Sequence, residues 1–197
     1  MNLFRNIERN IIMKKVYLAF LSFTVALLTL SCSGDDDGDV VNNSSNNMKV
    51  DDIEFELKAG VIEDFGSFNN DLYNFDITLI SSDVDTSQSV PSPTEDIISG
   101  IYFELFSTNP DDLAVGEYKL VDIEEDVSNK TFDYAFVFLD LDVSSGEIDG
   151  EPSGLTSGSL NVISNAPDYE IEFSGIDSEG REISGNYKGM LSMYTID

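Results

Sequence analysis

Hydrophobic and polar residues alternate with a period of two through most of the chain after Asp52. Phe75, Ile77 and Leu79, for example, are separated by single polar residues. This period places the apolar side chains on one face of a β-strand, whereas an amphipathic helix needs a period of 3.6. We therefore predict about eight strands, over residues 53–57, 73–79, 101–105, 118–120, 132–143, 160–162, 169–173 and 183–193.

The segments between these strands carry residues that are typical of turns. Asp177-Ser178-Glu179-Gly180 predicts a hairpin in which Gly180 adopts a positive φ. The longest irregular stretch, 81–99, contains Pro91 and Pro93, and we expect an exposed loop or a frayed edge there. Together the pattern predicts an all-β fold: a single antiparallel β domain of about eight strands, arranged as a β-sandwich or a flattened up-and-down barrel.

Residues 131–141 differ from the other predicted strands because both of their faces are apolar. One interpretation is a central strand that a sandwich partner covers on one side and a loop or flanking segment covers on the other. The alternative is that one face lines a hydrophobic ligand cavity. A regular strand would place Phe132, Tyr134, Phe136 and Phe138 on one face and Ala135, Val137, Leu139 and Leu141 on the other.

A charged and then apolar segment precedes the alternating region. Lys14 and Lys15 are followed by the uncharged residues 16–30 and then by Ser31 and Cys32. As a helix, this apolar run would be about 22 Å long, shorter than the roughly 30 Å hydrocarbon core of a bilayer. We therefore predict a secretory signal peptide over residues 1–31 rather than a membrane span or a buried helix. Translation could also start at Met13.

The sequence Leu28-Thr29-Leu30-Ser31-Cys32 resembles a lipobox, the cleavage site of bacterial lipoproteins with a type II signal peptide. The resemblance implies that Cys32 becomes the first mature residue and is lipidated. The acidic run at residues 35–37 resembles the tract that accompanies export to the cell surface in lipoproteins of the Bacteroidota. It implies an outer-membrane, surface-exposed protein. We expect a flexible acidic linker over 32–51 and the β domain over 52–197.

Three segments of the second half resemble uncharacterised surface lipoproteins of the Bacteroidota. They are Gly158–Val162, Tyr169–Phe173 and Gly185–Leu191. This resemblance implies a small β domain at the cell surface and supplies no catalytic residues.

Composition removes several functional classes. The 197 residues include 10 Lys and Arg, 38 Asp and Glu, no His, no Trp and one Cys. Without His, the nucleophile systems and metal sites that use imidazole are excluded, and a single Cys cannot close an internal disulfide. A net charge of −28 argues against a nucleic-acid partner. We therefore expect a non-catalytic protein whose partner is the membrane, through Cys32.

Carboxylates are the abundant polar groups, so we considered calcium first. The run from residue 140 to 151 places acids at positions 1, 3 and 12, as in an EF-hand loop, but Gly146 and Ile148 each come one position late. We therefore expect no cofactor, with a weaker alternative of calcium at a different kind of site here or at Asp83 and Asp85. The candidate ligands are Asp140, Asp142, Glu147, Asp149 and Glu151.

Glu104 is the carboxylate with the most unusual predicted surroundings, because its neighbours on one strand face are Tyr102 and Phe106. A paired carboxylate at the floor of an aromatic cleft would suggest a glycosidase, whereas a strand carboxylate commonly faces water or a Lys. Our leading hypothesis is a surface binding or structural module. The alternatives are a lipocalin-like carrier of a small hydrophobic ligand and a glycan-binding accessory protein that uses Tyr73, Tyr102, Tyr134, Tyr169 or Tyr187.

Overall fold

The computed structural model describes residues 46–69, 71–122, 127–144 and 152–195. These residues form an all-β fold, as the alternating pattern predicted. The strands are β1 (Asn47–Val50), β2 (Ile53–Glu56), β3 (Ala59–Asn69), β4 (Leu72–Ile80), β5 (Val84–Asp85), β6 (Ser92–Pro93), β7 (Ile97–Ser107), β8 (Gly116–Leu120), β9 (Thr131–Asp142), β10 (Ser153–Ser164), β11 (Tyr169–Asp177), β12 (Glu182–Gly189) and β13 (Leu191–Thr195).

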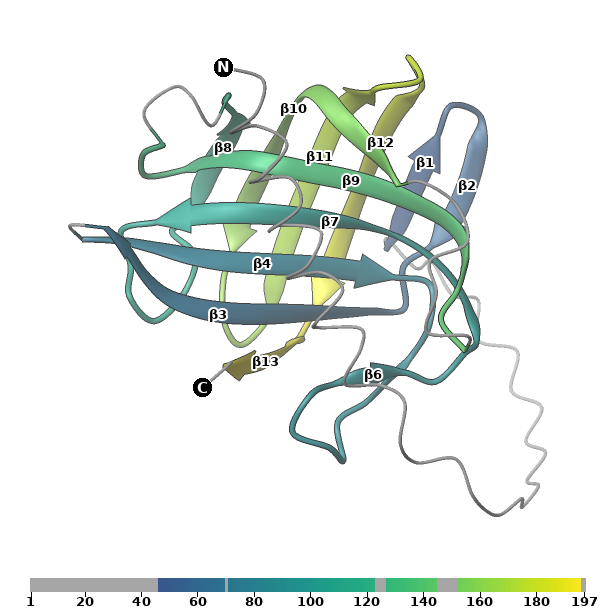
Figure 1. Cartoon of the computed structure of the whole chain (residues 1–197), viewed down its shortest axis with the longest axis horizontal. Coiled ribbons are helices and arrows are strands. Elements are labelled where there is room, and N and C mark those ends of the chain that lie inside the picture. Colours follow the sequence, from purple (N-terminus) through teal and green to yellow (C-terminus); the bar gives the residue numbers. More distant parts are fainter. Residues whose placement is uncertain (1–45, 70, 123–126, 145–151, 196–197) are drawn as a thin grey trace, which may run out of the picture.

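Eleven strands form one sheet in the order β13-β3-β4-β7-β9-β8-β10-β11-β12-β1-β2, and β5 and β6 form a separate two-stranded ribbon. The sheet curls so that β3, β4, β7 and β9 form a front half that faces β8, β10, β11 and β12 (Figure 1). The expectation of a single antiparallel domain of about eight strands is therefore wrong. The sheet is larger and mixed, because β13 pairs parallel with β3 and β8 pairs parallel with β9.

Two chain crossings at one corner join the halves of the curled sheet. The chain passes from β2 to β3 through Leu57 and Lys58, and from β12 to β13 through Met190. Here Gly60 lies opposite Leu191, and a Cβ on Gly60 would come within 2.3 Å of the Leu191 side chain. The Tyr187 hydroxyl donates a hydrogen bond to the Met190 carbonyl at 2.8 Å and fixes the second crossing. A larger residue at position 60 would have to displace the ends of the Leu191 and Leu79 side chains.

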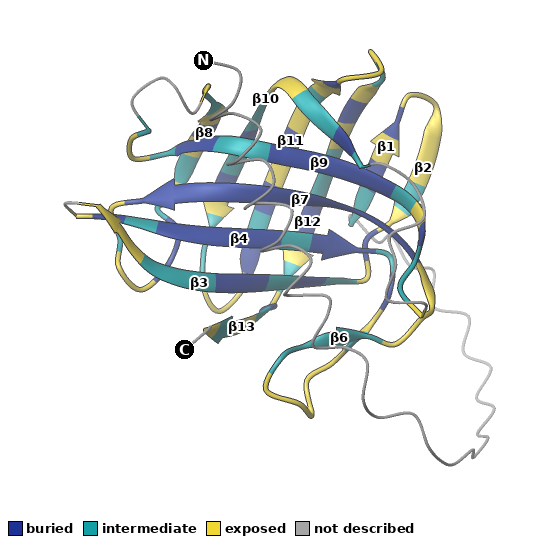
Figure 2. Cartoon of the chain, in the orientation of Figure 1, coloured by how far each residue is buried: buried dark blue, intermediate teal, exposed yellow. Residues whose placement is uncertain are grey.

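The inner face of the curl is filled by large apolar side chains. Phe75, Phe103, Phe132 and Tyr118 are fully buried there, and the Phe103 ring makes edge contacts with Phe132 and Phe173. Burying such side chains supplies the main favourable free energy of folding, at about 25 cal/mol per Å² of apolar surface. Buried residues run through the middle of the front strands, whereas the end of β3 is exposed (Figure 2).

A second apolar cluster lies on the outward face of the front half. It contains Ile80, Ile98, Tyr102, Phe136, Phe138 and Leu141, and Val84 of the β5 strand packs against it. Both faces of β9 are therefore buried, and residues 81–96 contribute to the cover on one side. This agrees with the interpretation of a central strand that is covered on both sides.

Two irregularities in β9 change which face its side chains take. The register with β7 shifts between Glu104 and Leu105 and again between Ile98 and Gly100. The first shift turns Phe132 inward with Ala135, and the second, at Asp140 with φ of 50°, turns Leu141 outward. The regular alternation expected for 131–141 is wrong at these two residues, because a bulge adds a residue and inverts the side-chain faces beyond it.

The structure adds elements that the pattern did not indicate. β1 lies inside the range expected to be linker, so the described fold begins at Asn46. β3 was missed because two glycines and a bulge at Gly66, with φ of 75°, interrupt its alternation. The segment 81–99 contains β5, β6 and the start of β7. No helix long and apolar enough to cross a membrane occurs among the described residues.

The hairpin between β11 and β12 is confirmed, with Gly180 at φ of 82°. Asp177 organises this turn although its carboxylate is buried. Its Oδ1 accepts hydrogen bonds from the backbone N–H groups of Glu179 and Arg181, and its Oδ2 accepts one from Arg181 Nε at 2.7 Å. Burial alone would raise the pKa of Asp177, but the bonds from Arg181 outweigh burial and hold that pKa below its ordinary value.

We predict that Asp177→Ala lowers the free energy of unfolding by about 2–3 kcal/mol, because charge-assisted bonds to a buried carboxylate are lost. Glu179→Ala in the same turn is the matched control. Glu179 is exposed and pairs with Arg181 only at the surface, so the expected change is below about 0.5 kcal/mol. Denaturant unfolding measures both.

The loss of stability in Asp177→Ala should depend on pH. Because the pKa of Asp177 is lowered on folding, its contribution is fully present above the ordinary aspartate pKa and is lost as the pH falls through the folded value. The difference between wild type and Asp177→Ala should therefore shrink in acid. Equal effects of the two alanine variants would contradict this role.

Candidate functional site

Three carboxylates lie side by side across the front half of the sheet. Glu63 on β3 is directly opposite Asp76 on β4, and Asp76 is directly opposite Glu104 on β7. Their strand neighbours Ile62, Ile77 and Phe103 face the inner core, so the period of two directs the carboxylates outward. We call Glu63, Asp76 and Glu104 the carboxylate row.

A tyrosine stands at each end of the carboxylate row. Tyr134 on β9 is opposite Glu104, and Tyr194 on β13 is opposite Glu63. The Tyr194 hydroxyl donates a hydrogen bond to Glu63 Oε2 at 2.7 Å. A third hydroxyl, from Tyr102 on β7, donates to Asp76 Oδ2. The row is therefore bordered by phenol groups that hydrogen-bond to two of its three members.

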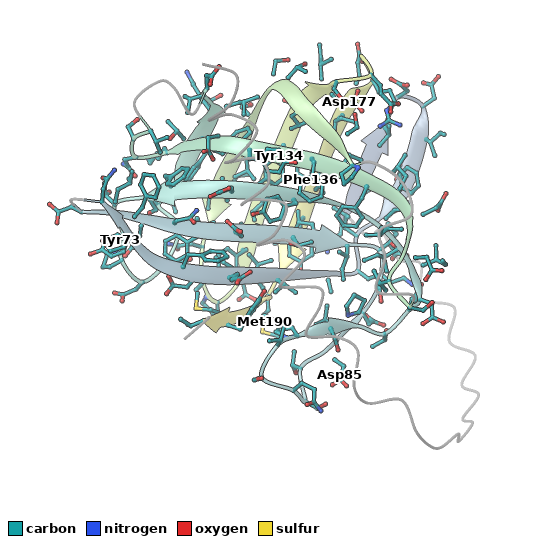
Figure 3. All side chains as sticks on the ribbon, viewed as in Figure 1. Tyr73, Asp85, Tyr134, Phe136, Asp177 and Met190 are labelled. Carbon is teal, nitrogen blue, oxygen red and sulfur yellow. The ribbon has the colours of Figure 1, made fainter. Side chains whose placement is uncertain are left out.

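The rings next to the row form a compact cluster. Tyr102 and Phe136 stack with their centroids 4.8 Å apart, and Tyr134 lies 5.5 Å from Phe136 and 6.2 Å from Tyr102. We call these three residues the ring cluster. Figure 3 shows Tyr134 and Phe136 on β9, in the front half of the sheet. Rings and carboxylates therefore share one outward surface, which we call the acid–aromatic face.

The carboxylate row is nearly inaccessible to solvent, with exposed fractions of 6% for Glu63, 8% for Asp76 and 9% for Glu104. Like charges directly opposite each other on a sheet destabilise it, and burial strengthens this effect. The row also acts on its neighbours. Burial and the negative charges of Asp76 and Glu104 raise the pKa of Tyr102 well above its ordinary value. Burial and the bond to Glu63 raise the pKa of Tyr194.

This arrangement suits two kinds of chemistry. Aromatic faces stack on the apolar faces of sugar rings or bind cations, and carboxylates accept hydrogen bonds from hydroxyl or ammonium groups. Neighbouring carboxylates such as Asp76 and Glu104 are also the groups that glycoside hydrolysis uses. A metal is not favoured by the geometry, because no group of three or more acidic or Cys side chains within the described ranges could hold an ion.

The sequence-based site candidates take different places. Glu104 belongs to the carboxylate row. Asp140 and Asp142 end β9, and Asp142 accepts hydrogen bonds from Ser144 in its own turn. Asp85 accepts bonds from Ser87, which hold its pKa below the ordinary value. Cys32, Glu147, Asp149 and Glu151 lie outside the described residues.

Sequence reasoning missed Asp76 and Glu63. Asp76 occupies a polar position of an alternating strand and looked like an ordinary solvent-facing residue. Glu63 lies in β3, which was not predicted. The useful signal would have been the pairing of β3, β4 and β7, which aligns all three acids and does not follow from periodicity.

No protein-family model, curated protein or solved structure matches this chain.

We predict that Tyr102→Phe weakens the fold by about 1–2 kcal/mol near neutral pH, because the buried Asp76 loses a donor. The difference in free energy of unfolding between wild type and Tyr102→Phe should become smaller at alkaline pH. Because the pKa of Tyr102 is raised on folding, its contribution is fully present below the ordinary tyrosine pKa of about 10 and is lost as the pH rises through the folded value.

Urea unfolding of the two proteins between about pH 8 and 11 measures this difference. Tyr194→Phe should show the same convergence, because the pKa of Tyr194 is also raised. If the differences in free energy of unfolding between wild type and the two variants stay constant over this pH range, neither hydroxyl interacts with the carboxylate row.

Proposed function

We propose that this chain is an exported lipoprotein with a non-catalytic β domain that binds a ligand at the cell surface. The anchor is supported by the sequence around Cys32, where an apolar run ends in small residues and an acidic tract. The described fold begins at Asn46, and in this proposal the residues between Cys32 and Asn46 act as a flexible tether, since a flexible chain of that length has a mean reach of about 20 Å. Two or more acyl chains on Cys32 would hold the protein stably in a membrane.

One observation supports ligand binding most directly: the carboxylate row places three acidic side chains in line on one sheet. Such an arrangement opposes folding stability, whereas neutral or alternating side chains would serve a purely structural sheet better. Features that break local stability rules concentrate at functional sites. The acid–aromatic face is therefore the surface that we assign to ligand binding.

A glycan is the ligand class that this face favours among the alternatives. Tyr134, which is partly exposed and lies directly opposite Glu104, offers a ring face for stacking on a sugar. Tyr102 and Phe136 are buried and pack against that ring. A carrier of small hydrophobic ligands would need space inside the curl. That inner face is occupied by Phe75, Phe103 and Phe132, so the observations favour the outward face instead.

We propose binding rather than catalysis at this face. A glycosidase needs one carboxyl group free to transfer a proton and room for water beside the other. Asp76 is engaged by the Tyr102 hydroxyl, Glu63 by Tyr194, and the whole row is nine-tenths buried. These buried and engaged carboxyl groups do not meet the requirements of a glycosidase.

The anchor is tested by Cys32→Ala in a bacterium that processes lipoproteins. We expect a larger, unprocessed protein that no longer fractionates with the outer membrane, because no thiol remains for acylation. Globomycin should have the same effect on the wild type. Unchanged size and location in both experiments would refute the lipoprotein proposal.

The binding face is tested by Glu104→Gln, which keeps the side-chain shape but removes one charge from the row. We expect the free energy of unfolding to rise by about 0.2–1 kcal/mol, because a like-charge contact is relieved. Both proteins are then run in affinity gels that contain a neutral soluble polysaccharide. Where a polysaccharide retards the wild type, it should retard Glu104→Gln less.

Glu172→Gln is the matched control, because Glu172 is an exposed acid on β11, on the other half of the sheet. It should change neither stability nor retardation. A destabilised Glu104→Gln protein, or one that is retarded as strongly as wild type, would contradict the assignment.

A further inference from the structure

The chain enters the folded domain at a fixed point. Asn46 Nδ2 donates to the Lys188 carbonyl at 3.0 Å, and Asn46 Oδ1 accepts from the Lys188 N–H at 2.7 Å. The Asn46 carbonyl accepts a further bond from the Leu57 N–H at 3.1 Å. These three bonds hold Asn46 at the corner where β2 passes into β3 and β12 passes into β13. Any tether that precedes Asn46 must therefore leave the domain at this corner.

The same corner carries an exposed apolar side chain. Met190, two residues after Lys188, is 73% exposed, the highest value among the large hydrophobic side chains that the structure describes. Met193 on the adjoining β13 is 47% exposed. Met190 does not belong to a loose loop, because its carbonyl is fixed by the Tyr187 hydroxyl. Figure 3 shows Met190 beside β13 and Asp177 at the opposite end of the molecule.

Two acids at this corner are paired with lysines, although further carboxylates near both lysines keep the corner acidic overall. Lys58 pairs with Glu95 at 2.7 Å, and Lys188 pairs with Glu170 at 2.8 Å. These are two of only six basic residues after Cys32, against 37 acidic ones. An anionic surface repels the domain as a whole, but it repels this corner less than parts whose acids lack a basic partner.

From these observations we infer that the β12–β13 corner contacts the lipid surface, with the Met190 side chain inserted among the headgroups. This inference rests on the proposed lipid anchor. A tether of about 20 Å holds Met190 at a high effective concentration near the bilayer, so a contact too weak to bind a free domain becomes populated. Insertion would orient the domain and direct the far end of β12 away from the membrane.

The lone Cys of the chain makes this contact measurable. In the lipidated protein the Cys32 sulfur is blocked by its thioether, so Met190→Cys provides a single reactive thiol for an environment-sensitive fluorophore. The labelled full-length lipoprotein is placed in vesicles of phosphatidylcholine with a minor fraction of phosphatidylglycerol, with or without brominated acyl chains. We expect blue-shifted emission that the brominated lipids quench.

Glu179→Cys is the matched control, because Glu179 is exposed in the hairpin at the other end of β12. The eight residues of β12 separate the two positions by about 26 Å. A probe at residue 179 should emit as in water and should escape quenching. Met193→Cys should give a smaller shift than Met190→Cys, which repeats the test without changing Met190.

Three results would overturn the inference in distinguishable ways. Protein that floats with the vesicles but shows water-like, unquenched emission at residue 190 refutes the contact and leaves the anchor intact. Labelled protein that does not float with the vesicles refutes the anchor and the contact together. A blue shift that depends on protein concentration and persists in detergent would assign Met190 to an interface between copies of this chain.

Discussion

The close approach of β3 and β13 at Gly60 is the contact on which the architecture depends. A side chain at that position would meet the ends of the Leu191 and Leu79 side chains, so a residue larger than glycine would have to displace them where the end of the chain lies against the start of the front half. With this contact made, β12 and β13 act as one bent strand that touches both halves of the sheet. The curl in turn encloses a single apolar core and leaves an outward face on which other side chains can be arranged.

The sequence predicted the class of the fold and most of its strands, because a period of two survives wherever one face is buried. It could not predict β1, which is four residues long, or β3, whose glycines and bulge disturb the alternation. It also treated 183–193 as one strand, although Met190 divides it between two different partners. Pairing between distant strands is set by packing of the whole chain, and periodicity carries no information about it.

The candidate site shows the same limit at the level of single residues. Glu104 was recognised because its aromatic neighbours lie two residues away on the same strand. Asp76 and Glu63 became significant only when the register placed them beside Glu104. An acid among polar positions of a strand looks like a solvent-facing residue until its cross-strand neighbours are known.

The bonds at Asn46 have a mechanical consequence. A force applied at the start of the described domain acts first on Asn46. Asn46 is hydrogen-bonded to Lys188 on β12 and to Leu57 at the β2–β3 crossing. A pull is thus shared between both crossings instead of peeling away the short strand β1. The first residue of the described fold therefore distributes an applied load over both crossings.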